Sequence, residues 1–266
     1  MRHPQRLRGA RLAPVLALFL LLPAVAGAAT PAGTVTLLTG RGTATGTDGS
    51  IRAMAKGDPV YSGDMVHTGA ASYIDLKFSD GGFFLLRPNT RFQVVDYVDK
   101  TGGAAAPAAP AAPKPAAPVA AQPQPAPLVS TAPQAGASHA FFRLLKGGFR
   151  SVSGLIGKIN HDDYQVATPV ATVGIRGTDY LAVICDSTCA TDPVIAAALP
   201  PGASALGGLV TSVYSDSIVV TTDKGSVTVE RFQYVLVLAD GTVIRLPGEP
   251  HFLHIDPVPN PTQCGG

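Results

Sequence analysis

Short runs of residues that favour β-strands, separated by turns that contain glycine and aspartate, recur along most of this 266-residue chain. Residues 73–78 alternate apolar and polar side chains, and the Asp80-Gly81 pair that follows is typical of a hairpin turn. Further runs come at 83–87 and 91–98, while helical periodicity is almost absent. Strands this short and this closely spaced predict an all-β domain, built as a sandwich or in a jelly-roll-like manner.

Residues 101–138 interrupt this pattern with a segment dominated by alanine and proline. Such a composition offers little to bury in a core, and it predicts a disordered, extended, polyproline-like loop. A docking ligand for a proline-binding partner is the alternative. Strand-like runs resume at His139. The strand-like runs on both sides of the segment can still fold together, because the entropy of loop closure grows only slowly with loop length.

Residues 185–246 return to short strand-like runs, with hairpin turns expected at 223–225 and 240–241. We expect this C-terminal β extension to pack on the same domain, and a small separate β unit is the alternative. Residues 247–266 are rich in proline and predict an irregular tail.

The first 28 residues have the features of a secretory signal peptide. Four arginines precede an apolar run at 12–22, and small residues close the segment, so we expect cleavage after Ala28. An uncleaved membrane anchor is the alternative. No later stretch of the sequence is long and apolar enough to cross a membrane. We therefore expect a periplasmic or secreted protein with no transmembrane segment in its mature chain.

The apparent basicity of the chain belongs to its N-terminus. Because residues 1–28 hold four arginines and no acid, their removal changes the formal net charge from +2 to −2. Proteins that bind nucleic acid normally carry a basic stripe or patch. The composition of the mature chain therefore argues against a nucleic-acid partner.

The chain has three cysteines, Cys185, Cys189 and Cys264. In an oxidising compartment two of them can pair, and a disulfide between Cys185 and Cys189 would staple the end of a strand. A metal site is the competing interpretation, but it lacks a second Cys or His pair at the spacing of a zinc site. Cys264 is then either free or paired between molecules.

An arginine between two glycines stands in the otherwise apolar, strand-like residues 164–180. Glycine in a strand marks a bulge, a bend or the close approach of another group. We interpret Arg176 as buried and paired with Asp179 or another acid, because a buried guanidinium needs a partner. An exposed Arg176 on a ligand-binding surface is the alternative. The structural signature that we predict consists of Thr168, Pro169, Gly174, Arg176, Gly177, Thr178 and Asp179.

Residues 168–180, TPVATVGIRGTDY, resemble the signature of the FecR-domain family. The likeness covers residues 33–184 apart from residues 101–138, and it continues weakly to about residue 246. Because it resumes at His139, the likeness implies that residues 101–138 are an insert within one β domain of residues 29–184. It implies an exported, all-β, non-catalytic protein. Three other segments carry the same resemblance: GDMVHTG (63–69), DLKFSDGGFFLLRPNTRF (75–92) and FFRLLKGGFRSVSGLIGKIN (141–160).

The members that give this family its name relay an iron-siderophore signal from an outer-membrane receptor to a sigma factor. They carry a cytoplasmic anti-sigma segment and a membrane helix for this purpose. We recognise neither feature in the present sequence. The resemblance therefore does not carry that particular role over to this chain.

Few residues of the sequence could carry out chemistry. His161-Asp162-Asp163 gathers an imidazole and two carboxylates, but adjacent strand residues point to opposite faces, so we interpret it as a turn. The sequence contains no Gly-x-Ser-x-Gly elbow and no Gly-rich phosphate loop before a helix. We therefore expect no catalytic, cofactor-binding or metal-binding residues, no cofactor and no enzymatic activity.

These observations predict an exported, non-catalytic, FecR-like binding or interaction module of the cell envelope, whose partner is a protein or a glycan. Envelope sensing or signalling is the specific role that the resemblance suggests. A structural or adhesive module of a surface or secreted assembly is the alternative. A hydrolase ranks third, because no catalytic constellation is visible in the sequence.

Overall fold

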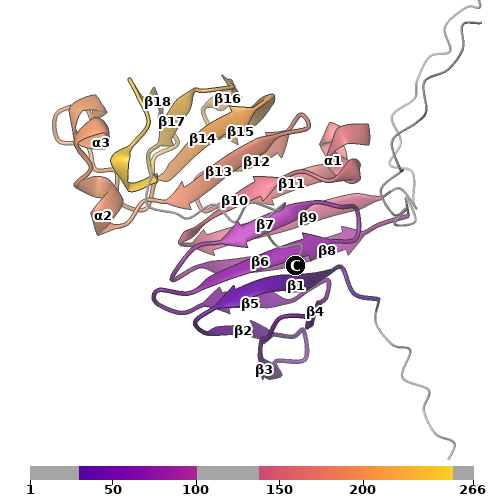
Figure 1. Cartoon of the computed structure of the whole chain (residues 1–266). Coiled ribbons are helices and arrows are strands. Elements are labelled where there is room, and N and C mark those ends of the chain that lie inside the picture. Colours follow the sequence, from indigo (N-terminus) through magenta and orange to yellow (C-terminus); the bar gives the residue numbers. More distant parts are fainter. Residues whose placement is uncertain (1–29, 101–137, 254–266) are drawn as a thin grey trace, which may run out of the picture.

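The structure is a computed structural model that describes residues 30–100 and 138–253. These residues form two nine-stranded sheets that face each other as a β-sandwich (Figure 1). The all-β prediction is confirmed. Four features of the sequence lie outside the described residues. They are the expected signal peptide at 1–28, all but the last residue of the expected insert at 101–138, Cys264 and the last part of the expected tail.

The first sheet, which we call sheet A, has the spatial order β18-β17-β14-β13-β10-β7-β6-β1-β4. All its neighbouring strands are antiparallel. In chain order its strands are β1 (Gly33–Thr39), β4 (Pro59–Val60), β6 (Tyr73–Phe78), β7 (Phe83–Leu86), β10 (Gly148–Val152), β13 (Asp179–Ile184), β14 (Leu209–Ser215), β17 (Tyr234–Val237) and β18 (Val243–Arg245).

The second sheet, sheet B, has the spatial order β16-β15-β12-β11-β9-β8-β5-β2-β3. Its strands β9 and β11 are parallel, and its other neighbours are antiparallel. In chain order the strands are β2 (Gly42–Thr45), β3 (Ile51–Ala53), β5 (Met65–Thr68), β8 (Arg91–Val98), β9 (His139–Lys146), β11 (Tyr164–Ala167), β12 (Thr172–Ile175), β15 (Ser217–Thr222) and β16 (Gly225–Glu230).

The strands on either side of the expected insert lie next to each other. Val98 of β8 pairs with His139 of β9, and the Lys100 amide donates a hydrogen bond to the Ser138 hydroxyl at 2.8 Å. The first described range therefore ends next to the start of the second. The strands within residues 185–246 extend both sheets, β14, β17 and β18 in sheet A and β15 and β16 in sheet B.

The main core lies between the two sheets, because alternate residues along each strand point inward. On β12, for example, Val173 and Ile175 are buried, whereas Thr172 and Gly174 face outward and are only half-buried. Aromatic rings fill the centre of this core, with neighbouring centroids 4.7 to 5.7 Å apart: Phe84, Phe92, Phe142 and Phe149.

A second, smaller core covers one end of the outer face of sheet A. A disulfide joins Cys185, which directly follows β13, to Cys189 in the first of the covering helices. The cover explains why β13 and β14 are buried on both faces. Outward-facing leucines and valines of these strands pack with the short helices α2 (Ser187–Ala190), α3 (Pro193–Ala198) and η2 (His251–Leu253).

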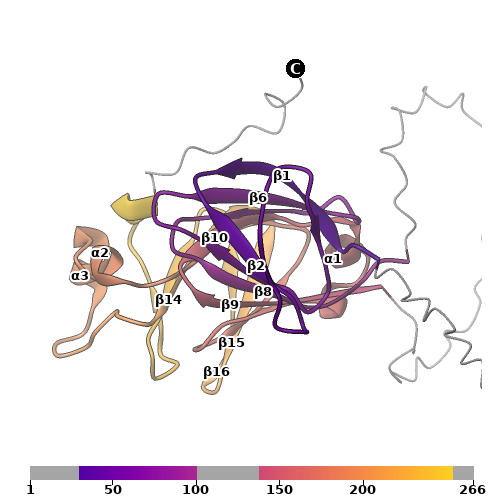
Figure 2. The same ribbon diagram turned by 90° about the horizontal axis from the view of Figure 1, so that it is seen from below.

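Two further short helices, α1 (Leu155–Ile159) and η1 (His161–Asp163), connect β10 to β11. They lie at the opposite end of the strands from α2 and α3, and Figure 2 shows the two sheets as layers between these groups of helices. The outer face of sheet B has exposed or half-buried side chains along β11, β12 and β15. Within the described ranges no second core covers this face.

Candidate binding site

The predicted signature begins with the turn between β11 and β12, which a threonine closes. The Thr168 hydroxyl donates to the Ala171 carbonyl at 2.7 Å and accepts from the Ala171 amide at 3.0 Å. Pro169, whose fixed φ suits a tight turn, is exposed at its tip. Thr168 and Pro169 therefore shape this hairpin.

Gly177 and Thr178 form the turn that takes the chain from β12 in sheet B to β13 in sheet A. Gly177 has a φ of +80°, a conformation that other residues rarely adopt. The buried Thr178 hydroxyl donates to the Ser217 carbonyl at 2.6 Å and accepts from the Arg176 amide at 3.2 Å. These bonds fix the backbone of the turn, so the fold sets the direction in which Arg176 leaves the sheet.

The side chain of Arg176 does not enter the core. Our prediction that it is buried and paired with an acid is wrong, because Arg176 is exposed. Its guanidinium makes no hydrogen bond or ion pair within the part of the chain that the structure describes. The reason is strand alternation, since Arg176 follows Thr172 and Gly174 on the outward side of β12.

Asp179 pairs instead with Arg150, on the outer face of sheet A. The Nε and Nη2 groups of Arg150 donate to the two carboxylate oxygens of Asp179 at 2.9 and 2.7 Å. This hydrogen bonding raises the pKa of Arg150. The guanidinium also lies over the ring of Tyr214, 4.6 Å from its centroid. Sequence interpretation missed Arg150, although an arginine in the middle of the short strand-like run 149–152 was an available signal.

The other glycine of the signature, Gly174, leaves a hollow on the outer face of sheet B. Strand β12 pairs with β11 and β15 through Gly174 without a register shift, and the φ of Gly174 is not positive. A Cβ atom at this position would come no closer than 3.9 Å to another group, the Val219 carbonyl oxygen. Neither the backbone nor the packing therefore requires glycine here. The space above it has a volume of about 470 Å³.

Polar side chains from four neighbouring elements surround this hollow. Gln165 of β11 and Val219 of β15 are the cross-strand neighbours of Gly174, and Thr172 pairs with Thr221 two residues along. The surface is open and offers both donors and acceptors, with the always-charged Arg176 at its rim. The lining residues are His161, Asp162, Gln165, Thr172, Gly174, Ile175, Arg176, Val219 and Thr221.

His161 and Asp162 belong to η1, a single 3-10 turn at the position where we expected a turn. The side chain of Asn160 accepts from the Asp162 amide at 3.3 Å and donates to the Asp163 carboxylate at 2.6 Å. Among the described residues, no three or more His, Cys, Asp or Glu side chains gather closely enough to hold a metal ion.

Within the described ranges 30–100 and 138–253, no helix has the length and the apolar character needed to span a membrane.

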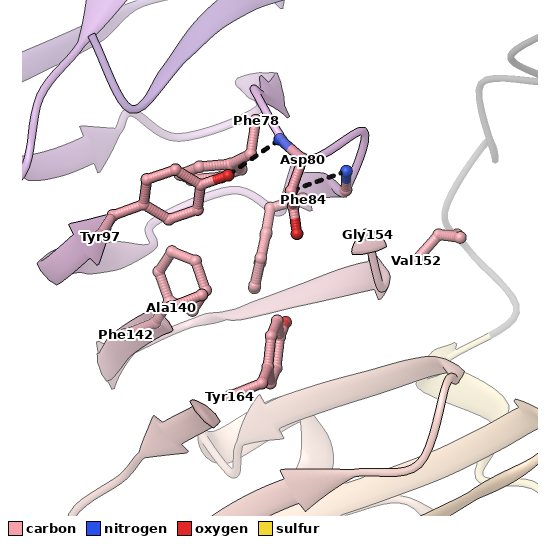
Figure 3. A pocket seen from close by; sticks show the side chains of 10 residues that line it. Phe78, Asp80, Phe84, Tyr97, Ala140, Phe142, Val152, Gly154 and Tyr164 are labelled. Carbon is pink, nitrogen blue, oxygen red and sulfur yellow. Dashed lines mark hydrogen bonds between the residues drawn. The ribbon is translucent and has the colours of Figure 1, made fainter. Parts of the chain in front are cut away.

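A buried carboxylate fixes α1, the helix that precedes η1 in the chain. Asp80, in the turn between β6 and β7, accepts from the Gly82 amide at 3.0 Å and from the Ile156 amide of α1 at 3.3 Å. A Cβ on Gly154 would lie 2.3 Å from this carboxylate, so only glycine fits there. Figure 3 shows Asp80 beside Tyr97, whose hydroxyl accepts from the Asp80 amide at 3.0 Å. The space among these side chains is too small for a water molecule, which makes it a packing feature.

The anchored helix packs directly against the signature. A Cβ on Gly157 would lie 2.3 Å from the Ile175 side chain, so α1 approaches β12 closely. A Cβ on Gly177 would lie 3.8 Å from Cγ of Lys158, which places Lys158 beside the turn that carries Arg176. Sequence interpretation assigned no helix here, because the five residues of α1 are too few to show helical periodicity.

No protein-family model and no curated protein matches this chain. Two crystal structures of a "putative anti-sigma factor" from Parabacteroides distasonis, at 1.65 and 2.50 Å resolution, are distantly similar to it. Each has a TM-score of 0.41 and 9% sequence identity, over 71% of this chain and 62% of that chain. The present chain thus matches less than two thirds of the length of those structures, and the likeness concerns the fold alone.

Proposed function

We propose that the protein is an exported, non-catalytic, protein-binding module of the cell envelope, and that its binding surface is the outer face of sheet B around the Gly174 hollow. One observation carries this proposal. The Arg176 side chain is exposed and forms no hydrogen bond or ion pair with an acid of the described chain, and it stands beside a space that Gly174 leaves open. Neither the backbone conformation nor the packing at Gly174 requires a glycine.

The unequal cover of the two sheets supports the choice of this face. The outer face of sheet A buries a second core and the Arg150–Asp179 pair, so much of it is already used within the molecule. The outer face of sheet B has no such cover within the described residues. A binding surface that is largely pre-formed loses little entropy on association. The Thr178 hydrogen bonds fix the backbone on the Arg176 side of the hollow in this way.

The location and the broader role rest on the sequence. The composition of residues 1–28 supports export, and the resemblance of residues 168–180 to the FecR-domain signature supports a role in envelope sensing or signalling. In such a role the module would bind another protein of the envelope and relay its presence.

The test fills the hollow without disturbing the fold. Gly174→Gln adds a side chain where a Cβ meets nothing closer than 3.9 Å, and Gly248→Gln is the matched control, because a Cβ on Gly248 meets nothing within 4 Å. A photo-cross-linking amino acid at position 221, on the hollow, reports binding in the full chain within living cells. The same amino acid at position 34, exposed on β1 of sheet A, reports background.

We expect a discrete protein adduct from position 221 and none from position 34. The adduct should persist in Gly248→Gln and disappear in Gly174→Gln, while the melting temperature of both variants stays near that of the original protein. An adduct of equal yield in Gly174→Gln, or equal yields from both cross-linker positions, would rule out the hollow as the binding surface.

A further inference from the structure

We infer that the outer face of sheet B also binds a linear acidic polysaccharide, which lies across strands β5, β8 and β9. Its acidic groups bind Arg91, Arg143 and Lys146. This inference goes beyond the proposed function, because it concerns a second ligand and residues that do not line the Gly174 hollow.

The register of the sheet brings these three exposed cations together. Arg91 of β8 lies directly opposite Lys146 of β9. Gln93, two residues along β8, lies opposite Arg143, which makes Arg143 a diagonal neighbour of Arg91. Directly opposite side chains have Cβ atoms about 4.5–5.5 Å apart, and diagonal neighbours are about 7–8 Å apart. The cations therefore form one cluster, on strands in the interior of the sheet.

Too few acids are present to neutralise this cluster. None of the three cations forms an ion pair or a side-chain hydrogen bond within residues 30–100 and 138–253. Strands β2, β5, β8, β9 and β11 contain one acid, Asp96, which already bonds the His139 ring at 2.9 Å. With histidines counted as neutral, these five strands carry a net charge of +2, whereas the expected mature chain carries −2.

The neighbouring strand adds no negative charge. His67 of β5 lies directly opposite Arg91, and burial together with the charge of Arg91 lowers the pKa of His67. Its imidazole is therefore mostly neutral at pH 7. Like charges directly opposite each other destabilise a sheet. The fold thus loses stability by holding Arg91 opposite Lys146, and a broken local rule of this kind is typical of a functional site.

The groups around the cations favour a glycan. Gln93 and His67 offer donors and acceptors for sugar hydroxyls, and Phe141 on the same face of β9 offers a half-buried aromatic ring for sugar C–H groups. Protein interfaces have cores that are depleted in charged residues, whereas the charges here lie on interior strands. A membrane surface requires apolar side chains that insert, and Val95 and Leu145 are only 37% and 36% exposed.

Titration of the full chain with polygalacturonate, a linear polysaccharide of uronic acids, tests this inference. We expect calorimetry at low salt to show binding that weakens as salt is added, because salt screens exposed charges. Neutral dextran should not bind. Arg91→Gln, Arg143→Gln and Lys146→Gln should each weaken the affinity about threefold, and the triple variant about thirtyfold. Arg231→Gln, at an exposed arginine in the turn after β16, is the matched control and should leave the affinity unchanged.

Two further measurements separate loss of the ligand site from loss of the fold. The double variant Arg91→Lys, Arg143→Lys keeps the charges and should bind within about threefold of the original protein. The triple glutamine variant should melt no lower than the original protein, because it no longer holds like charges opposite each other. A lower melting temperature would show that these cations serve the fold, and it would overturn the inference.

Other results would also overturn it. These are no binding of polygalacturonate, and equal affinity in the original protein and the triple glutamine variant. Tighter binding of polyglutamate would assign the cluster to an acidic protein, and tighter binding of phosphatidylglycerol vesicles would assign it to a membrane. None of these substitutions alters a residue that lines the Gly174 hollow, so the cross-linking from position 221 judges the proposed function separately.

Discussion

Arg52 and Arg245 bridge the two sheets at opposite ends of the sandwich. Arg52, on edge strand β3 of sheet B, donates from Nη2 to the Pro59 carbonyl on edge strand β4 of sheet A at 3.2 Å. Arg245, on edge strand β18 of sheet A, donates from Nη2 to the Thr228 carbonyl on edge strand β16 of sheet B, also at 3.2 Å. Figure 1 shows these pairs of edge strands at the two ends of the stacked sheets.

Edge strands present unpaired backbone groups that another chain can use to add a strand. Each arginine occupies one carbonyl that such an addition would use. Arg52 has a second role, because its guanidinium also pairs with the buried carboxylate of Asp64. The two bridges disfavour assembly by strand addition, which is one way in which a structural or adhesive module could polymerise.

Removal of Arg245 should promote self-association through β16. Arg245→Ala frees the Thr228 carbonyl, and we expect sedimentation velocity to show oligomers that increase with protein concentration. Arg231→Ala removes a cation whose guanidinium lies 4.3 Å from the ring centroid of Phe232, and it serves as the control. Identical sedimentation of Arg245→Ala and the original protein would contradict a protective role for this arginine.

Arg150→Ala should destabilise the protein far more than Arg176→Ala. Loss of Arg150 leaves the half-buried Asp179 carboxylate without two hydrogen bonds, which we expect to lower the free energy of unfolding by about 2–3 kcal/mol. Arg176 is exposed, so its truncation should change this free energy by less than about 0.5 kcal/mol. Urea denaturation followed by circular dichroism measures both values. A larger loss in Arg176→Ala would restore the interpretation of that arginine as a structural residue.

The two glycines around Arg176 should respond differently to alanine. Gly177→Ala forces a side chain into a φ of +80° and should cost about 1–2 kcal/mol of stability. Gly174→Ala meets nothing closer than 3.9 Å and should be neutral, or stabilising by about 0.4–1 kcal/mol through the unfolded state. Melting temperatures distinguish the two. Strong destabilisation by Gly174→Ala would mean that the fold itself requires this glycine.

Asp75→Asn should raise stability at neutral pH. Burial raises the pKa of Asp75, although the Thr36 hydroxyl donates a hydrogen bond to its carboxylate at 2.8 Å. A carboxyl whose pKa is higher in the folded than in the unfolded protein lowers stability as the pH rises through these two values. The amide oxygen of asparagine can still accept from Thr36, so the gain should appear at neutral pH and vanish below about pH 3. Melting curves across this range check it, and a loss of stability at neutral pH would contradict it.

Export should remove the first 28 residues. We expect Edman sequencing or mass spectrometry of the protein recovered from the cell envelope or the medium to find Ala29 as the first residue. Replacing Ala28 with a bulky residue such as phenylalanine should slow this cleavage and cause the precursor to accumulate. A protein that keeps Met1 and stays with the membrane would support the alternative of an uncleaved anchor.

Strand content and turns could be predicted from the sequence because both depend on local properties. Alternation of apolar and polar residues at 73–78 marks β6 without any knowledge of its partners. The Asp80-Gly81 pair gives the hairpin turn that follows, with a φ of +85° at Gly81. The loop between Cys185 and Cys189 is likewise short enough for its disulfide to be considered from spacing alone.

The sequence by itself therefore determined the all-β class and most of the turns, and only the tertiary structure decided the direction and the partner of each charged side chain. Arg176 and Asp179 are three residues apart, which made them the obvious pair. The Gly177 turn moves the chain from sheet B to sheet A between them, so their side chains leave opposite faces of the sandwich. Asp179 then meets Arg150, 29 residues away in the sequence, and Arg176 is left facing the hollow. Pairings of this kind depend on which strands become neighbours, and that depends on the packing of the whole chain.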